Sequence, residues 1–434
     1  MYYQPVKVTK PKIIGFWRGW SIAVGCAIGS GIFMMPTLLA PYGMLGLGGW
    51  LIAGGGSILV ALTMSRLVRR IPKTGGPYTY VHEGLGHFPG FIIAWTYWIS
   101  CISAIAGISI AFVGYLGFFI PIINTSSVFS LICSLALVWT IIGLNIRSIE
   151  DSAKFQVLST VVKLLPLFFI VFLGITNISL ENTPEFNPTN LHPFVLLATT
   201  TTLVMWSFIG IETATVPAEH FIEPEKTIPK VLMVSVITVL IIYILVSLAI
   251  SIIVPANELI NSSAPFTLAA TKILGISGGV IITFGALIST LGSLNANTLT
   301  AGNIAFAAAR DNLLPNKFLI LSKSGTPIFS FLITGLFVTT LLTMNYTKGL
   351  IAAFTFMAML STLSTLLAYA FCAISDMVFI NKDNPNKNKT TALFMSFATL
   401  VYATFAIWGA GIQIIISGLI LILLGMPIYI YLNK

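Results

Sequence analysis

The stretch "GCAIGSGIFMMP", residues 25–36, lies in the middle of the first long apolar segment of the chain. It holds three glycines, and a glycine inside a helix costs about 1 kcal/mol relative to alanine. In hydrocarbon every backbone N–H and C=O needs a partner, so unwound backbone is tolerated only within protein or beside a cavity. If this segment crosses a membrane, its glycines predict a break in the helix and a binding site at the break.

The composition indicates an all-α polytopic membrane protein. Of 434 residues, 56% are hydrophobic and only 8% are charged, against about 25% charged in a soluble domain. Lys7, Lys10 and Lys12 precede the first apolar segment and no small-residue cleavage site follows, so we expect no cleaved signal peptide. The four cysteines show no metal-ligand spacing, which predicts neither metal nor disulfide. The net charge of +9 is typical of cytoplasmic membrane loops and needs no nucleic-acid partner.

Twelve apolar segments are expected to span the bilayer. The basic residues gather at alternate ends of these segments, whereas Glu181, Glu185 and Glu258 fall at the opposite ends. The positive-inside rule therefore predicts a multi-pass protein of the cytoplasmic (inner) membrane with both termini in the cytoplasm. No linker is long enough to divide the chain, so residues 1–434 are expected to form one domain. The segments are 15–41, 46–68, 89–120, 126–146, 155–177, 193–217, 229–254, 278–307, 327–344, 350–374, 391–410 and 412–432.

A second interruption occurs in "MWSFIGIETATVPAE", residues 205–219, within the sixth segment. Segments one and six would open two five-helix halves, and interrupted segments at corresponding positions of two repeats indicate a transporter site. The half-helix beginning near Gly31 would present free N–H groups and a positive dipole end, to which Ser30 adds a hydroxyl donor. Together these groups suit a carboxylate.

Five motifs resemble the amino acid–polyamine–organocation superfamily, and most closely its basic amino acid/polyamine antiporter branch, which includes arginine/agmatine antiporters. The resemblance implies twelve helices in a LeuT-type 5+5 inverted repeat plus two, with helices 1 and 6 broken. It divides the chain into a tail (1–14), two five-helix repeats (15–177 and 193–374) and two last helices (391–432). The motifs are "IGSGIFMMP" (28–36), "PKTGGPYTYVHEGLG" (72–86), "WSFIGIETATVPAEHFIEPEKTIPK" (206–230), "LGSLNANTLTAGNIAFAAARDNLLP" (291–315) and "SGTPIFS" (324–330).

The resemblance also implies site residues on the two broken helices. The substrate carboxylate would lie on Ser30 and Gly31, next to Ile28, and the ammonium on the carbonyls of Ala27, Trp206 and Ile209. The indole of Trp206 would pack against the substrate.

Two positions depart from the arginine/agmatine antiporters, so arginine selectivity is not carried over. Asn297 stands where these have a tryptophan, and Ile105 where they have an asparagine. Asn297 either hydrogen-bonds a polar substrate side chain or pairs with Asn295 or Thr298 inside the bundle; the sequence leaves both open.

Two charged residues lie deep in apolar segments, where a charge is costly enough to indicate function. Lys163 follows Lys154 by nine residues, about 13 Å along a helix. It resembles the segment-five lysine whose ammonium replaces sodium in sodium-independent family members. Glu212 matches a family glutamate implicated in pH dependence or gating, and Tyr97 matches a gate aromatic.

The predicted function is secondary transport of an amino acid or related amine, by exchange or proton coupling and without sodium. The chain lacks the repeats of a channel filter, the converging groups of a membrane enzyme and a GxxxxGK[ST] nucleotide loop. A membrane amino-acid sensor of the same fold, without transport, is the alternative. The expected partners are the small-molecule substrate and the lipid bilayer, with no cofactor; proton coupling and a homodimer remain open.

Overall fold

The computed structural model describes residues 14–147, 162–177, 182–322, 325–383 and 389–432, and the account below concerns these residues. Lys7, Lys10, Lys12, Lys154 and Glu181 lie outside them. Nine helical stretches of the described chain are long and apolar enough to cross a membrane. The first of them, Phe16–Arg70, contains three successive helices. Two shorter apolar stretches cover Leu164–Thr176 and Pro193–Phe208. The described chain has no strand beyond two isolated bridges. The nearly all-helical fold that the sequence predicts is confirmed at this level.

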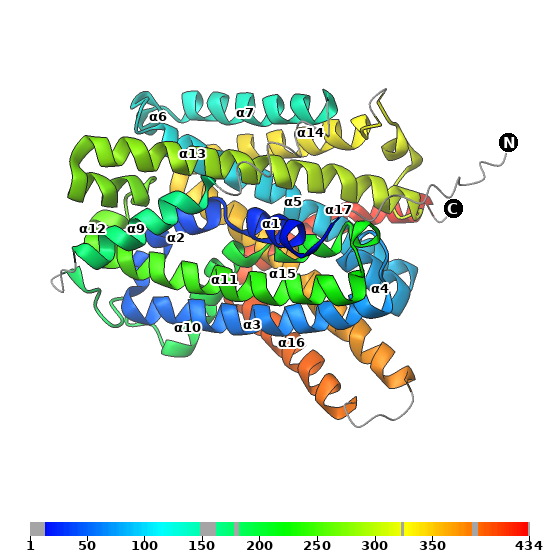
Figure 1. The fold of residues 1–434 in the computed structure, drawn as a ribbon. Helices are drawn as coiled ribbons and strands as arrows, with labels where there is room; N and C mark the ends of the chain where they lie inside the picture. The colour runs from blue at the N-terminus through cyan, green and yellow to red at the C-terminus, as the bar shows by residue number, and fades with distance from the viewer. Residues whose placement is uncertain (1–13, 148–161, 178–181, 323–324, 384–388, 433–434) are drawn as a thin grey trace.

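Most of the helices run roughly parallel or antiparallel in one bundle, which α16 crosses obliquely (Figure 1). We name the two ends of the bundle after short helices. The α4 end holds α4 and the C-terminal end of α17, and the α6 end holds α6 and α12 (Figure 1). The helices are α1 (Phe16–Ala27), α2 (Ser30–Leu39), α3 (Gly43–Arg70), α4 (Pro77–Leu85), α5 (His87–Leu116), α6 (Ile122–Thr125), α7 (Ser127–Arg147), α9 (Leu164–Thr176), α10 (Pro193–Met205), α11 (Pro224–Ile253), α12 (Ala256–Leu259), α13 (Pro265–Arg310), α14 (Ile328–Asn345), α15 (Leu350–Lys382), α16 (Lys389–Gly409) and α17 (Ile412–Leu432).

The core is built around α5, which packs against α13, α15 and α4. In its most apolar stretch 89% of the residues are buried, against 11% in α17, although both are apolar enough to span a membrane. Apolar side chains exposed on α17, such as Leu423 and Leu424, suit contact with lipid tails. The bundle thus has a buried centre and a lipid-compatible rim.

Two apolar segments are discontinuous near their middle. α1 ends at Ala27 and α2 begins at Ser30, with Ile28 extended (φ −76°, ψ 100°) between them. α10 ends at Met205 and gives way to short 3₁₀ turns over Trp206–Phe208, Ile211–Thr215 and Ala218–His220. α13 is also kinked, at Gly275, where φ is +68°. The two discontinuities meet, because α1 packs against the 3₁₀ turn that follows Gly210.

A buried ion pair joins three helices toward the α4 end. Arg66 of α3 donates to Asp376 of α15 at 2.8 Å, and Ser396 of α16 donates to the same carboxylate at 2.8 Å. The Asp376 side chain is 2% exposed. At the surface, Arg70 pairs with the half-exposed Asp383 and holds the pKa of that carboxyl below its usual range by hydrogen bonding.

We expect Asp376→Ala to lower the free energy of unfolding by about 3–5 kcal/mol, because it leaves the Arg66 guanidinium without its partner in a largely buried position. Asp383→Ala is the matched control, and it should change the melting temperature little because its pair is solvated. Thermal unfolding of both variants in detergent measures the difference. Equal melting temperatures would show that the buried pair does not stabilise the bundle.

Candidate functional site

The end of α1 leaves backbone carbonyls without helical partners. In a continuous helix Gly25 O, Ala27 O and Ile28 O would accept from the N–H groups four residues on, which lie beyond the break. These carbonyls are buried within the bundle, where an unsatisfied polar group costs several kcal/mol. Donors must therefore come from elsewhere in the fold.

Three side chains from three different helical segments supply those donors. Lys163 Nζ, just before α9, donates to Gly25 O at 2.5 Å. Tyr243 Oη of α11 lies 2.9 Å from Ala27 O and 3.1 Å from Ser207 O, and so links the two discontinuous segments. Ser293 Oγ of α13 donates to Ile28 O at 3.0 Å. Lys163, Tyr243 and Ser293 are at most 1% exposed.

Two buried hydroxyls, one at the start of α2 and one in the turn after α10, have no hydrogen-bond partner in the described structure. Ser30 is 1% exposed and its hydroxyl has no hydrogen-bond partner there, and the same holds for the hydroxyl of the fully buried Ser207. A Cβ added at Gly31 would lie 2.6 Å from Ser207 Oγ and 2.9 Å from Ser207 Cα. The two segments therefore touch backbone to backbone at this point.

The second discontinuity depends on Gly210. Its φ of +110° lies in the region that favours glycine, and a Cβ there would lie 3.1 Å from the backbone carbon of Cys26. Ile209 just before it is extended (φ −62°, ψ 134°). Trp206, 6% exposed, packs edge-on against Phe354 of α15 with ring centroids 6.1 Å apart.

One small cavity lies where the two segments meet. Six of the seven predicted substrate-binding residues line it, and the seventh, Ile28, accepts a hydrogen bond from Ser293 in its wall. The cavity volume is about 20 Å³, which holds about one water molecule. A larger ligand would require the lining to move. The six residues are Ala27, Ser30, Gly31, Trp206, Ile209 and Asn297.

Asn297 pairs with neither of the partners considered from the sequence. Its Nδ2 donates to Ser293 O at 2.9 Å, one turn back in α13. Thr298 bonds Leu294 O, and Asn295 accepts from Asn145 of α7 at 3.0 Å. Asn297 thus faces the cavity while Asn295 joins two helices.

Glu212 lies beside a second cavity of about 20 Å³ on the α4 side of the first. Tyr97 Oη donates to Oε1 at 2.9 Å and the Gly210 N–H to Oε2 at 3.0 Å, while Tyr369 adds a further hydrogen bond. The side chain is 3% exposed. These contacts join α5, α15 and the broken segment across the path between the first cavity and the α4 end.

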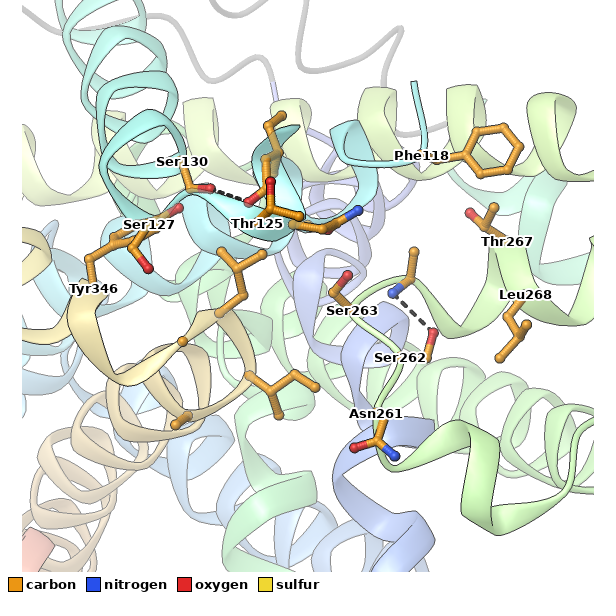
Figure 2. Close-up of a pocket in the computed structure, with 18 of the residues that line it drawn as sticks. Phe118, Thr125, Ser127, Ser130, Asn261, Ser262, Ser263, Thr267, Leu268 and Tyr346 are labelled. Atoms are coloured by element: carbon orange, nitrogen blue, oxygen red, sulfur yellow. Dashed lines mark hydrogen bonds between the residues drawn. The ribbon is translucent and has the colours of Figure 1, made fainter. Parts of the chain in front are cut away.

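A much larger cavity, of about 820 Å³, opens at the α6 end between α5, α6, α13 and the start of α15 (Figure 2). Both cavities lie beside α5. Ile108 lines the small cavity, and Gly114 lines the large one about 9 Å further along the helix. Trp206 lines the small cavity and packs against Phe354, which follows Ala352 of the large cavity's lining by two residues. We call the large cavity the outer vestibule, because it lies away from the centre of the bundle, at the α6 end.

Sequence reasoning missed Tyr243, Ser293 and Tyr369 as parts of this site. Each lies in an otherwise regular apolar helix, where a tyrosine or serine carries no local signal. The predicted break did indicate that such residues exist, because a broken helix leaves carbonyl groups that need hydrogen-bond donors from elsewhere.

Comparisons with known proteins identify the family. The amino acid permease family model matches residues 14–432. An arginine/ornithine antiporter of Pseudomonas aeruginosa is 27% identical, over 92% of this chain and 87% of its own length. The putrescine transporter PotE of Haemophilus influenzae is 26% identical, over 93% of each chain. An arginine/ornithine antiporter of Latilactobacillus sakei is 27% identical, over 96% of this chain and 90% of its own length.

The molecule is therefore a multi-pass membrane permease, a secondary transporter of a small molecule and not an enzyme. The chain belongs to the amino acid permease family, in the basic amino acid/polyamine antiporter branch of its superfamily. The relatives named above are antiporters or transporters, so the alternative of a sensor without transport has no support.

We expect Gly31→Ala to reduce transport at least tenfold, because its Cβ would displace the Ser207 backbone and separate the two segments. Gly143→Ala in α7 is the control, since a Cβ there meets nothing within 4 Å. Uptake by equal amounts of each inserted variant gives the comparison. Normal uptake by Gly31→Ala would mean that the close approach is unimportant.

Proposed function

We propose that the chain carries an amino acid across the cytoplasmic membrane, by exchange or proton coupling and without sodium, with the small cavity as its binding site. The observation that carries the proposal is the meeting of two discontinuous segments at a cavity that holds unused donors and redirected carbonyls. Relatives named as an antiporter and as a transporter align with 92% and 93% of this chain. Discontinuous helices with free dipole ends are the feature on which such sites are built.

The proposed topology has twelve spans in a 5+5 repeat plus two, forming one domain, with the α4 end in the cytoplasm. Most of the described basic residues support this orientation, because they stand at helix ends that lie toward the α4 end: the last turns of α3, α7, α13 and α15 and the first turns of α11 (Figure 1). Lys272 and Lys348 lie toward the α6 end, and Lys272 is neutralised by Glu258 at 2.7 Å. The outer vestibule would then face away from the cytoplasm. Assembly into a homodimer stays a prediction.

The start of α2 suits the substrate carboxylate. It combines the N–H groups of the first helical turn with the Ser30 hydroxyl, which is buried and without a partner in the described structure. The carbonyls of Trp206 and Ile209 suit the ammonium. Ala27 O already accepts from Tyr243, so an ammonium there would share this carbonyl with the hydroxyl or displace it.

Ser30→Ala should weaken binding of an amino acid substrate about 5- to 150-fold, the equivalent of the 1–3 kcal/mol lost with a donor to a charged group. The decarboxylated amine of the same substrate, which has no carboxylate, should lose much less. Thermal stabilisation of purified protein by each ligand measures both affinities. Equal losses for the two ligands would exclude Ser30 from the carboxylate site.

Lys163 is proposed to take the place of a bound sodium ion. Its ammonium reaches a carbonyl freed by the break in helix 1 and is 0% exposed, so it supplies a fixed cation at that point.

Glu212, held by Tyr97, Tyr369 and Gly210, is proposed as the gating group on the cytoplasmic side. Whether either residue carries a proton is open to experiment.

Uptake of labelled amino acid into proteoliposomes tests the function and the role of Lys163 together. Wild-type uptake should be the same when choline replaces sodium, and Lys163→Ala should insert normally but transport poorly because Gly25 O loses its donor. Lys272→Ala, which breaks a partly exposed ion pair, is the control and should transport normally. Sodium-stimulated uptake, or full activity of Lys163→Ala, would contradict the assignment. Specific binding without uptake of any ligand would contradict transport itself.

A further inference from the structure

The walls of the small cavity carry no charge to match a second charge on a substrate. Its described lining contains glycine, alanine, isoleucine, serine, cysteine, one tryptophan and one asparagine, with no acidic or basic side chain. The carboxylate and ammonium of an amino acid are met by the start of α2 and by freed carbonyls, as proposed above. A further guanidinium, ammonium or carboxylate would enter a buried site of about 20 Å³ whose lining offers it no counter-charge.

The charged residues nearest the small cavity, Glu212 and Lys163, already have hydrogen-bond partners in the protein. Glu212 has donors on both carboxylate oxygens and lines the neighbouring cavity instead. Lys163 is directed at Gly25 O. Neither side chain lines the small cavity.

The outer vestibule is equally poor in negative charge. Its described lining is formed by uncharged residues and one lysine, Lys348, without an aspartate or glutamate. Lys348 Nζ lies 5.2 Å from the ring centroid of Phe356. A cavity with one positive charge does not concentrate polycations, since charged clefts attract ligands of the opposite sign.

Asn297 is the side chain in the small cavity that suits recognition of a neutral polar group. Ser293 O can only accept, so the amide nitrogen of Asn297 faces it and Oδ1 is the other end of the amide. Oδ1 accepts from no described residue, and one N–H of Nδ2 is also unused. An amide with a spare donor and a spare acceptor can bind a hydroxyl or another amide. Ala104 and Ile108 give the remaining wall apolar surface.

We infer that the substrate is a zwitterionic amino acid with an uncharged side chain, small and preferably polar, and that a dication such as ornithine or putrescine is disfavoured. The inference rests on the proposed function, because it takes the small cavity as the substrate site. It separates this chain from relatives whose names specify arginine, ornithine or putrescine.

A panel of ligands tests the inference. Unlabelled alanine, serine, threonine, asparagine, glutamate, arginine, ornithine and putrescine are loaded one at a time inside proteoliposomes, and each is assayed for exchange with its own labelled form outside. We expect at least one of the four uncharged amino acids to exchange at least tenfold faster than every charged ligand at equal concentration. Fastest exchange of arginine, ornithine, putrescine or glutamate would overturn the substrate class and leave transport standing. Exchange of none of the eight, although the protein is folded and inserted, would count against the proposed function itself.

The isosteric variant Asn297→Asp places a carboxylate in the cavity without a change in size. It should raise the ratio of ornithine to neutral amino-acid affinity at least tenfold, read from thermal stabilisation of the purified variant. Asn261→Asp makes the same chemical change on an exposed residue of the outer vestibule, and should leave this ratio unchanged. Should Asn297→Asp fail to fold, Ala104→Asp puts the carboxylate on the facing helix α5. An unchanged ratio in a folded variant of either kind would overturn the inference.

Discussion

The break in the first helix depends on giving its freed carbonyls donors inside a low-dielectric core. Donors must come from the protein, since the helix does not continue and hydrocarbon offers no hydrogen-bond partner. Lys163, Tyr243 and Ser293 meet this requirement from three different helical segments. The carbonyls they reach lie beside the small cavity, and Ser293 also lines it.

This arrangement links the site to the rest of the bundle. Tyr243 contacts carbonyls of both discontinuous segments with one hydroxyl, so a ligand ammonium that takes Ala27 O would change how the two segments are held together. Toward the α4 end, Glu212 joins the broken segment to α5 and α15 through Tyr97 and Tyr369. Toward the α6 end, Trp206 of the small cavity's lining packs against Phe354 of α15. Alternating access in such a fold would open one of these sets of contacts while the other stays closed.

The sequence predicted the helical class. Glycines at residues 25–31 and 210 stand where the described helices give way to other backbone, between Ala27 and Ser30 and around Gly210. The sequence singled out Lys163 by its depth in an apolar segment and by its resemblance to a sodium-replacing lysine, a role that stays a prediction; its Nζ donates to Gly25 O. It did not predict Tyr243 or Ser293, whose roles depend on how α11 and α13 are oriented against α1. Helix orientation follows from long-range packing, which a local pattern does not encode. The sequence left two roles open for Asn297. Its position in the cavity lining depends on how α13 is rotated about its axis, which only the structure gives.

A cryo-EM structure of the chain with a transported amino acid bound tests the central claim most directly. The account predicts the carboxylate within hydrogen-bond distance of Ser30 Oγ and the first N–H groups of α2, the ammonium on carbonyls of the discontinuous segments, and Lys163 Nζ still on Gly25 O. A substrate bound only in the outer vestibule would contradict it, as would a first helix that runs unbroken through residues 28–30.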